Sequence, residues 1–430
     1  MNQAMVKRSC LLVVVFAFVM MFAVSAHAQT TLQVAIVWGT EQHESAGFLA
    51  AAEAFERLHP GVKIEFISGA GWSDPGDGPT SKLMTHIAGG LSPDLAMVGG
   101  MGVPQFAHMG LLMPLDSYIQ RSNVREEDFI PATWKQTQWL GKQYAMTLQV
   151  DPNFALVWQK DMFSEAGFDP DRGPQTLAEY EEHLQKLTRI GADGRATQLG
   201  HRVWDVYGGA NTIYTWGWIF GGDFYDYENN VVTAADPLVV ESLEYLRDYY
   251  ERWNPAVHSQ IRFPDGTEAM RFAVSANVKH WRQSFPDVEM GASLEPYKAD
   301  SGAPNPSWIG GWAMGILPEA PNPDLAWEFL HFMTATPEGT DAFGRASGWI
   351  PAYLPSPAHE PFMDDPIMSV YLEIAQTARN MRPGMPVTGD YAVMLEEAFQ
   401  DVMNGRKQPR EALLFVQEQV QAKLDEALAQ

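Results

Sequence analysis

The sequence contains a single cysteine, Cys10, close to its N-terminus. An intramolecular disulfide is therefore excluded, and the stability of the chain must come from a large core. The sequence also lacks the H-E-x-x-H, G-x-S-x-G and P-loop spacings, and its histidines are scattered. We therefore expect no metal, no cofactor and no enzymatic activity of the zinc-hydrolase, serine-hydrolase or nucleotide-hydrolysing kinds.

Positive charge is scarce as well. Lysine and arginine number 29 against 53 aspartates and glutamates, which gives a formal net charge of −24. Such an acidic chain is not expected to bind nucleic acid or an anionic membrane surface. Aromatic residues, in contrast, are abundant, with 14 Trp, 14 Tyr and 22 Phe. Most of these rings are expected in the core, because large rings dominate burial.

The N-terminus is predicted to be a secretory signal peptide. Lys7 and Arg8 precede the apolar run Leu11–Val24, and Ala26-His27-Ala28 is typical of a cleavage site. Cleavage after Ala28 would remove Cys10. A bacterial lipoprotein would need a cysteine at the cleavage point, so we expect a freely diffusing periplasmic protein. No later segment is apolar for long enough to predict a membrane span.

The rest of the chain, about 400 residues, is longer than one core usually supports, so at least two domains are expected. Its first part alternates strand and helix, which is typical of an open α/β sheet. The expected elements are strands at Leu32–Trp38, Val62–Ile67 and Leu95–Val98 and helices at Ser45–His59 and Lys82–Ala88. The last hundred residues are predicted to be mostly helical.

The stretch from Trp308 to Pro337 carries the most informative local pattern. Gly310-Gly311 allows the backbone to approach another group closely, because glycine has no Cβ. Trp312 follows at once, then the short apolar run Ala313–Leu317, and then a helix that begins near Asp324. This arrangement favours the presentation of one flat ring at a cleft rather than a catalytic group.

A series of short motifs extends over nearly the whole chain. In order they are Gly89-Gly-Leu-Ser-Pro-Asp94, Gly110-Leu-Leu-Met-Pro-Leu-Asp116, Gly141-Lys-Gln-Tyr144, Lys160-Asp-Met-Phe-Ser-Glu-Ala-Gly167, Gly221-Gly-Asp-Phe, Gly266-Thr-Glu-Ala-Met270, Gly310-Gly-Trp312, Pro323-Asp-Leu-Ala-Trp-Glu-Phe-Leu330 and Asn404-Gly405. The series resembles the extracellular solute-binding proteins of ABC importers, in the sugar-binding group that includes maltose- and glycerol-phosphate-binding proteins.

The resemblance implies an α/β protein with the type II periplasmic-binding-protein fold. Two discontinuous lobes would enclose a ligand cleft, and the C-terminus would be helical. The expected division is a signal peptide at 1–28, the N-lobe at 29–147 and 265–308, and the C-lobe at 148–264 and 309–430. The expected mechanism is hinge closure on the ligand by a monomer, followed by docking on the permease subunits of the transporter.

Sugars offer flat C–H faces and hydroxyl edges, so a sugar site needs aromatic platforms beside planar polar groups. Trp312 is the first candidate platform. Trp38 ends the first strand, at the edge where open α/β sheets bind ligands, and Glu41 and Gln42 follow on the same loop. Arg345 could bind hydroxyls or a carboxylate.

The resemblance adds further candidates by alignment, namely Asp151, Asn211, Tyr214, Trp281 and Tyr391. Tyr214 and Trp218 share one helix face, so at least one of these two rings should be in the core. Val98-Gly99-Gly100 stands where the maltose-binding protein has a stacking Trp, which argues against a maltodextrin ligand. The expected ligand is a sugar, an oligosaccharide or a polyol. A secreted glycoside hydrolase and a binding protein for a glycerophosphodiester remain as alternatives.

Overall fold

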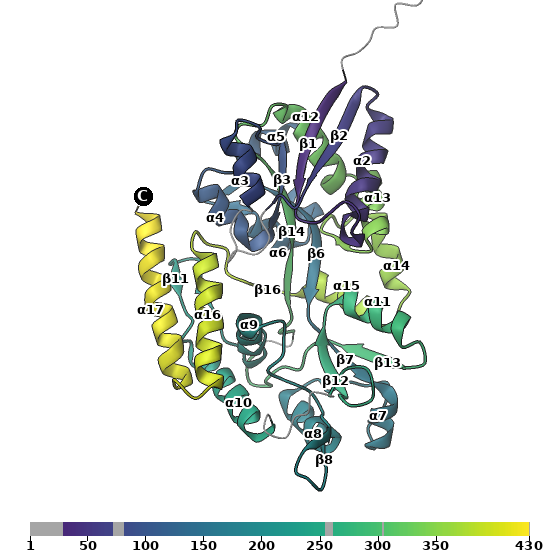
Figure 1. Cartoon of the computed structure of the whole chain (residues 1–430), viewed down its shortest axis with the longest axis vertical. Helices are drawn as coiled ribbons and strands as arrows, with labels where there is room; N and C mark the ends of the chain where they lie inside the picture. Colours follow the sequence, from purple (N-terminus) through teal and green to yellow (C-terminus); the bar gives the residue numbers. More distant parts are fainter. Residues whose placement is uncertain (1–28, 72–80, 254–260, 303–304, 430) are drawn as a thin grey trace, which may run out of the picture.

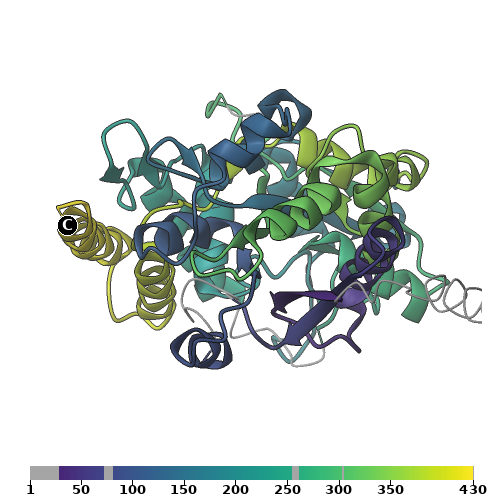
Figure 2. The ribbon, with the colours of Figure 1, turned by 90° about the horizontal axis from the view of Figure 1, so that it is seen from above.

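The computed structural model describes residues 29–71, 81–253, 261–302 and 305–429. The predicted signal peptide, residues 1–28, lies outside the described residues. The chain forms an upper lobe, which contains the N-terminal strands, and a lower lobe, which contains the long C-terminal helices (Figure 1). Seen from above, the C-terminal helices lie at one side of the molecule (Figure 2). Within the described residues, no helix is both long and apolar enough to cross a membrane.

The upper lobe is built on a seven-stranded sheet. The parallel strands β1 (Thr30–Ile36), β2 (Val62–Ser68) and β3 (Leu95–Gly99) form one half of it. The antiparallel strands β6 (Met146–Asn153) and β14 (Trp308–Ile316) continue the sheet beside β3. The βαβαβ order predicted from the sequence is therefore confirmed, with α2 (Ala46–Leu58) and α3 (Ser81–Ala88) as its helices.

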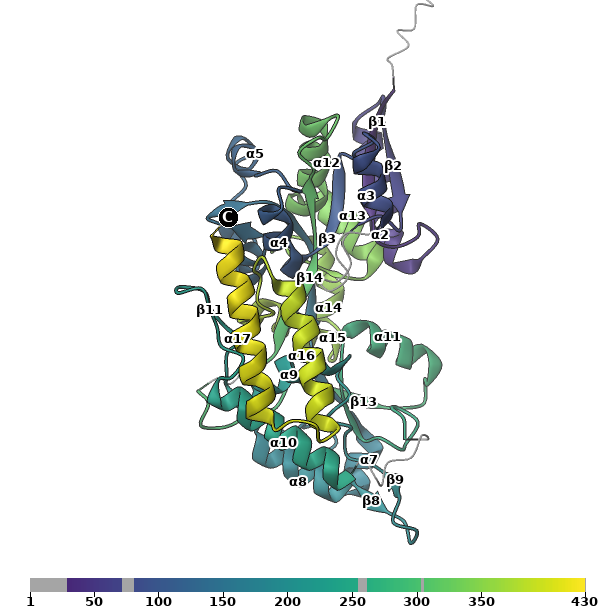
Figure 3. The same ribbon diagram turned by 60° about the vertical axis from the view of Figure 1, so that its left-hand side comes forward.

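The lower lobe is built on a three-stranded antiparallel sheet. Its central strand is β7 (Ala155–Gln159), which lies between β12 (Met270–Ala273) and β13 (Met290–Ser293). The helix α9 (Gly209–Phe220) is buried on nearly all sides, which agrees with its aromatic, almost uncharged sequence. The long helices α16 (Thr388–Met403) and α17 (Pro409–Leu428) lie side by side along the lobe (Figure 3).

The remaining elements complete the two lobes. The other helices are α4 (Val103–His108), α5 (Asp116–Arg121), α6 (Pro131–Gln136), α7 (Lys160–Glu165), α8 (Leu177–Leu187), α10 (Pro237–Trp253), α11 (Ser275–Ser284), α12 (Pro323–Ala335), α13 (Pro337–Ser347), α14 (Glu360–Met363) and α15 (Met368–Thr377). The other strands are short, namely β4 (Gln138–Trp139), β5 (Lys142–Gln143), β8 (Arg189–Ile190), β9 (Ala196–Gln198), β10 (Tyr225–Asp226), β11 (Val231–Val232), β15 (Ile350–Pro351) and β16 (Asn380–Met381).

Among the described residues, three segments pass between the lobes at the waist of the molecule. β6 leaves the upper sheet and continues almost directly into β7 of the lower sheet. β14 begins at Trp308, which is buried in the lower core, and ends at Ile316 in the upper core. β16 pairs with the first two residues of β14. The path at Gly310-Gly311 therefore runs from the lower lobe into the upper one.

The strand pairing differs from the lobe boundaries expected from the sequence. The segment 265–308 was expected in the N-lobe, but its strands β12 and β13 pair with β7 of the lower sheet. The segment 309–430 was expected in the C-lobe, but β14 pairs with β3, and α13 packs on α2 in the upper lobe. Hydrophobic periodicity identifies a strand without specifying its partner, because both lobes bury similar strands.

Candidate functional site

The floor of the candidate site is the two-stranded ribbon formed by β6 and β14. In this ribbon Trp308 lies opposite Asn153, Gly310 lies opposite Asp151, and Trp312 lies opposite Gln149. Alternate residues of a strand share one face, so Trp308, Gly310 and Trp312 line the same side of β14. Because Gly310 has no side chain, a gap opens between the two tryptophans beside Asp151.

Gly311 explains how the ribbon can be so tightly paired at this point. A Cβ placed on Gly311 would lie 2.3 Å from the carbonyl oxygen of Gln149, and the φ of Gly311 is +157°. The register also shifts between Trp312 and Ala313, which is a β-bulge. Bulges bend a strand and redirect its side chains, often beside functional sites. The close backbone approach predicted for Gly310-Gly311 is thus confirmed at Gly311.

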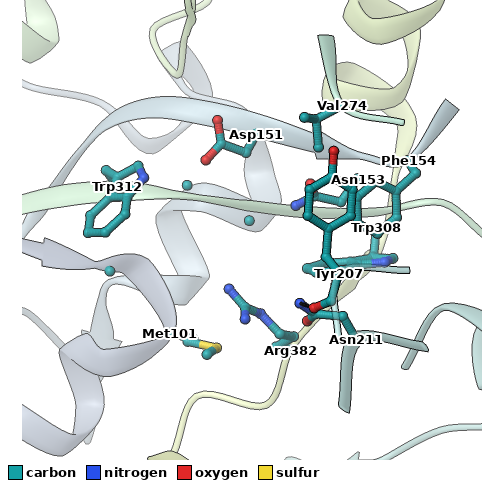
Figure 4. Close-up of a pocket in the computed structure, with 13 residues that line it drawn as sticks. Met101, Asp151, Asn153, Phe154, Tyr207, Asn211, Val274, Trp308, Trp312 and Arg382 are labelled. Carbon is teal, nitrogen blue, oxygen red and sulfur yellow. Dashed lines mark hydrogen bonds between the residues drawn. The ribbon is translucent and has the colours of Figure 1, made fainter. Parts of the chain in front are cut away.

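A cavity of about 180 Å³ lies above this floor, between the lobes. Figure 4 shows it, with side chains from both lobes pointing into the same space. Its walls combine aromatic rings with planar polar groups. The lining residues are Gly99, Met101, Asp151, Asn153, Phe154, Tyr207, Asn211, Val274, Trp308, Gly310, Gly311, Trp312 and Arg382.

The upper wall is an aromatic cluster. The ring of Trp312 packs edge-on against Trp38, with centroids 4.9 Å apart, and Trp38 packs against Trp349 at 5.2 Å. All three rings are half-buried. Ring pairs at such distances and tilts support one another, so Trp312 is held in place while part of its surface stays open to the cavity.

The lower wall is a second aromatic pair with its own polar supports. Tyr207 stacks on Phe154, with centroids 5.2 Å apart and planes 9° apart. The Tyr207 hydroxyl donates a hydrogen bond to Oδ1 of Asn277. Asn211 donates from Nδ2 to the Tyr207 carbonyl oxygen at 3.0 Å. These hydrogen bonds hold the Tyr207 side chain in place, although 48% of the residue is exposed.

Two opposite charges face the cavity. Asp151 accepts a hydrogen bond on Oδ1 from Nε2 of Gln149 at 3.1 Å. Burial raises the pKa of Asp151 to about 6, although the Gln149 bond and the positive charge of Arg382 act in the opposite direction. The Arg382 guanidinium lies 5.2 Å from the Trp308 ring centroid. At neutral pH the cavity therefore offers both a carboxylate acceptor and a guanidinium donor (Figure 4).

Some of the residues predicted from the sequence meet at this cavity. Asp151, Asn211 and Trp312 line it, and Trp38 contacts it through Trp312. Glu41 and Gln42 follow β1 on an exposed turn, where Oε1 of Gln42 accepts a hydrogen bond from the Gly39 amide at 3.0 Å. Neither of these two side chains is among the lining residues.

The other four predicted residues lie elsewhere. Tyr214 and Tyr391 are buried together in the lower core, and the Tyr391 hydroxyl donates to the Phe224 carbonyl oxygen at 2.9 Å. Trp281 is 9% exposed and packs against Phe263 at 4.6 Å. Arg345 is exposed on α13, where Asp341 and Glu360 bind it at 2.6 and 3.0 Å. In this structure these four side chains contribute to packing or to a surface ion-pair network.

Sequence reasoning missed seven of the cavity's side chains: Met101, Asn153, Phe154, Tyr207, Val274, Trp308 and Arg382. Strand alternation could have identified Trp308, which shares a face with Trp312, and Asn153, which shares one with Asp151. Tyr207 and Arg382 lie outside regular helices and strands, where no periodicity identifies a face. Within the described ranges, no group of three or more metal-binding side chains comes together.

The comparison with known proteins agrees with this architecture. The model of the bacterial extracellular solute-binding protein family matches residues 39–339. The chain belongs to this family. Among curated members, the "Probable amino-acid ABC transporter periplasmic-binding protein y4oP" of Sinorhizobium fredii is 26% identical over 190 residues, which cover 42% of this chain and 41% of that protein.

Two solved structures share the fold of this solute-binding protein over almost its full length. The cyclic α-maltosyl-1,6-maltose binding protein of Arthrobacter globiformis has a TM-score of 0.75 and 21% identity, and the match covers 92% of this chain and 99% of that one. UgpB of Mycobacterium tuberculosis, in complex with glycerophosphocholine, has a TM-score of 0.73 and 20% identity, covering 93% and 99%. The predicted type II periplasmic-binding-protein fold is thereby confirmed.

Proposed function

We propose that this solute-binding protein captures a small polyhydroxylated solute, a sugar or a polyol, in the cavity on the β6–β14 ribbon. The solute would then be delivered to the permease subunits of an ABC importer when the lobes close on it. The observation that carries this proposal is the composition of the cavity. Aromatic rings from both lobes and planar polar groups converge on one gap above Gly310.

The chemistry of the walls fits such a ligand. The C–H faces of a sugar ring pack well on Trp312 above and on the Tyr207–Phe154 pair below. Hydroxyl groups need partners that both accept and donate. The Asp151 carboxylate accepts, the Arg382 guanidinium donates, and the Asn153 and Asn211 amides do both. The volume of about 180 Å³ lies below the range of roughly 300–1,000 Å³ usual for drug-sized ligands, which favours a small solute.

The glycoside hydrolase alternative is less well supported. Glycoside hydrolysis usually requires two carboxyl groups that flank the scissile bond at a separation of about 5–10 Å. Among the lining residues, which all belong to the described part of the chain, Asp151 is the single carboxylic acid. The cavity can therefore accept a hydroxyl hydrogen bond, but it does not present a general acid opposite a nucleophile.

A glycerophosphodiester is the second candidate ligand. Arg382 is the single cation among the lining residues, and guanidinium groups bind phosphate well. UgpB of Mycobacterium tuberculosis, which was solved with glycerophosphocholine, shares the fold. The nearby Asp151 carboxylate would repel a phosphate, so we rank this ligand below a neutral polyhydroxylated solute.

We also propose that the protein acts as a periplasmic monomer, released by cleavage after Ala28 and without a lipid anchor. The Ala26-His27-Ala28 sequence, the absence of a cysteine at that point and membership of an extracellular family support this location. Mass spectrometry of the exported protein tests the cleavage directly. A mature N-terminus at a residue other than Gln29, or a lipid-modified one, would contradict this proposal.

A thermal-shift screen tests the ligand proposal. Neutral sugars, polyols, glycerophosphodiesters and amino acids are added one at a time, each at millimolar concentration. A solute at 100 times its dissociation constant stabilises a protein by about 2.7 kcal/mol, which is readily visible as a rise in Tm. Stabilisation by sugars or polyols without turnover supports the proposal. A shift produced by amino acids alone, or hydrolysis of an oligosaccharide, would refute it.

A further inference from the structure

The helix α11 contacts the lower wall of the cavity and, in the upper lobe, the residue that precedes Trp349. It follows β12 and precedes β13, so its two ends are anchored in the lower sheet. Val274, the residue before the helix, lines the cavity. In Figure 1 the helix lies at the level of the waist, directly below the helices that descend from the upper lobe. The resemblance pointed to Trp281 on this helix, although the residues of the helix have mostly low helix propensity.

Asn277 connects α11 to the lower wall. Its Oδ1 accepts a hydrogen bond from the Val274 amide at 3.3 Å and another from the Tyr207 hydroxyl. One amide oxygen therefore holds two cavity-lining residues. Because the Tyr207 ring also stacks on Phe154, its position is fixed relative to α11 as well as to the β6–β7 segment.

Lys279, half a turn further along the helix, reaches the upper lobe. Its Nζ donates a hydrogen bond at 2.5 Å to the carbonyl oxygen of Gly348 and lies 5.3 Å from the Phe362 ring centroid. Gly348 is the C-cap of α13, in the left-handed conformation with φ +70°. The C-terminus of a helix carries partial negative charge, so an ammonium group is well placed there. The lysine is half-buried, and burial lowers its pKa.

The residue after Gly348 connects this contact to the ligand cavity. Trp349 packs on Trp38, and Trp38 packs on Trp312. Lys279 therefore holds the backbone from which the upper aromatic wall is supported, while Asn277 on the same helix holds the lower wall. One short helix spans the distance between the two walls.

We propose that Lys279 is a positioning residue that clamps the lobes together and sets the width of the cavity. Lys279 itself does not line the cavity. When its bond to Gly348 is broken, α11 keeps the ion pair between Arg282 and Asp365 at 2.5 Å but loses its hold on the backbone before Trp349. The lobes can then rotate further apart about the three crossing segments. The proposal rests on the proposed function only for the identity of the cavity as the ligand site.

The experiment measures the distance between the lobes with no solute present. Spin labels are attached at Glu53→Cys on α2 and Gln185→Cys on α8, both exposed, in a Cys10→Ser background. Electron–electron double resonance then gives the distance distribution for the parent protein and for Lys279→Met, which keeps an apolar stem but cannot donate. We expect the distribution of Lys279→Met to broaden and shift to longer distances, and that of Lys279→Arg to stay close to the parent.

Lys298→Met is the matched control. Lys298 is also half-buried, also lies near a ring, that of Phe220, and donates to Glu241 within the lower lobe at 2.8 Å. Its removal should leave the distribution unchanged. Lys279→Ala serves as the second variant if Lys279→Met does not fold. A distribution identical to the parent in the folded variant overturns the proposal, and so does an equal shift in Lys298→Met. Neither result depends on the ligand screen.

Discussion

Two adjacent glycines should respond differently to the same substitution. Gly310→Ala and Gly311→Ala each add one methyl group to the floor of the cavity, one residue apart on β14. We expect Gly311→Ala to destabilise the fold and Gly310→Ala to leave the stability nearly unchanged. The difference follows from what each new Cβ would meet.

At Gly311 the new Cβ would lie 2.3 Å from the Gln149 carbonyl oxygen, which is backbone and cannot rotate away. A carbon and an oxygen in ordinary contact are about 3.4 Å apart, so one strand of the ribbon must move by roughly 1 Å. Overpacking of this kind costs about 1–3 kcal/mol. In a domain of 150–250 residues each kcal/mol lowers Tm by about 2–4 °C.

At Gly310 the nearest atoms to the new Cβ are Nδ2 of Asn153, at 3.1 Å, and two side-chain atoms at 3.9 Å. These are the ends of side chains, which can move by a few tenths of an ångström. The loss of glycine's conformational freedom in the unfolded chain slightly favours alanine. The methyl group would occupy the gap between Trp308 and Trp312, so Gly310→Ala should weaken ligand binding about tenfold or more, since a well-packed site tolerates extra atoms poorly.

Urea unfolding and thermal unfolding, followed by circular dichroism, measure the two stabilities. Gly191→Ala, in the β8–β9 hairpin far from the ribbon, controls for the substitution itself. An equal loss of stability in Gly310→Ala and Gly311→Ala would show that the 2.3 Å approach does not hold in solution. A stable Gly311→Ala would show the same.

Three further predictions concern single side chains. Trp312→Ala should lower solute affinity at least tenfold, since a central ring contributes about 2 kcal/mol or more, and calorimetric titration measures this loss beside Trp139→Ala on the β4 strand as a control. Because Trp312 also packs on Trp38, the variant should lose some stability as well, which thermal unfolding measures. Tyr391→Phe should cost about 1 kcal/mol of stability, because the Phe224 carbonyl keeps the Thr233 amide but loses the Tyr391 hydroxyl as a donor. Solute affinity should be unchanged, and weaker binding would return Tyr391 to the site. Burial raises the pKa of Asp151 from 3.8 to about 6, so the folded protein binds more protons than the unfolded chain between these values. The stability of the wild type relative to Asp151→Asn should therefore fall by about 2 kcal/mol as the pH rises from 4 to 6. A difference that is independent of pH would contradict the burial of this carboxyl.

Local sequence patterns predicted the individual helices and strands more accurately than they predicted which strands pair with each other. The strand β2 covers Val62–Ser68 and the helix α3 covers Ser81–Ala88, each within one residue of the bounds expected from the sequence. The pairing of β12 with β7 joins residues more than a hundred positions apart. Both lobes offer buried strands of similar composition, so the sequence does not distinguish the partners.

In the candidate site, too, local features could be predicted from the sequence and long-range contacts could not. Gly310, Gly311 and Trp312 could be identified from the sequence, because a glycine pair before a ring has a steric meaning of its own. Tyr391 was misplaced, because helical periodicity separates a buried face from an exposed one but does not separate the core from the cleft. Arg382 joins the cavity only because β16 pairs with β14 and directs the following residue to the floor.

The floor of the cavity includes the strand β14, which crosses from the lower lobe to the upper one, and this placement affects how the site can select its solute. Trp308 is buried in the lower core and Trp312 belongs to the upper wall, yet they lie four residues apart on one strand. A rotation of the lobes bends this strand but cannot remove Gly310 or Asp151 from between the tryptophans. The polar contacts of the floor should therefore be available whether the lobes are open or closed, and should contribute to the first encounter with the solute. The distance between the Trp312 wall and the Tyr207 wall changes with rotation, so it is closure that tests the size of the solute. A solute too large for the gap would bind the floor and prevent closure, and would then be held without being presented in the closed form.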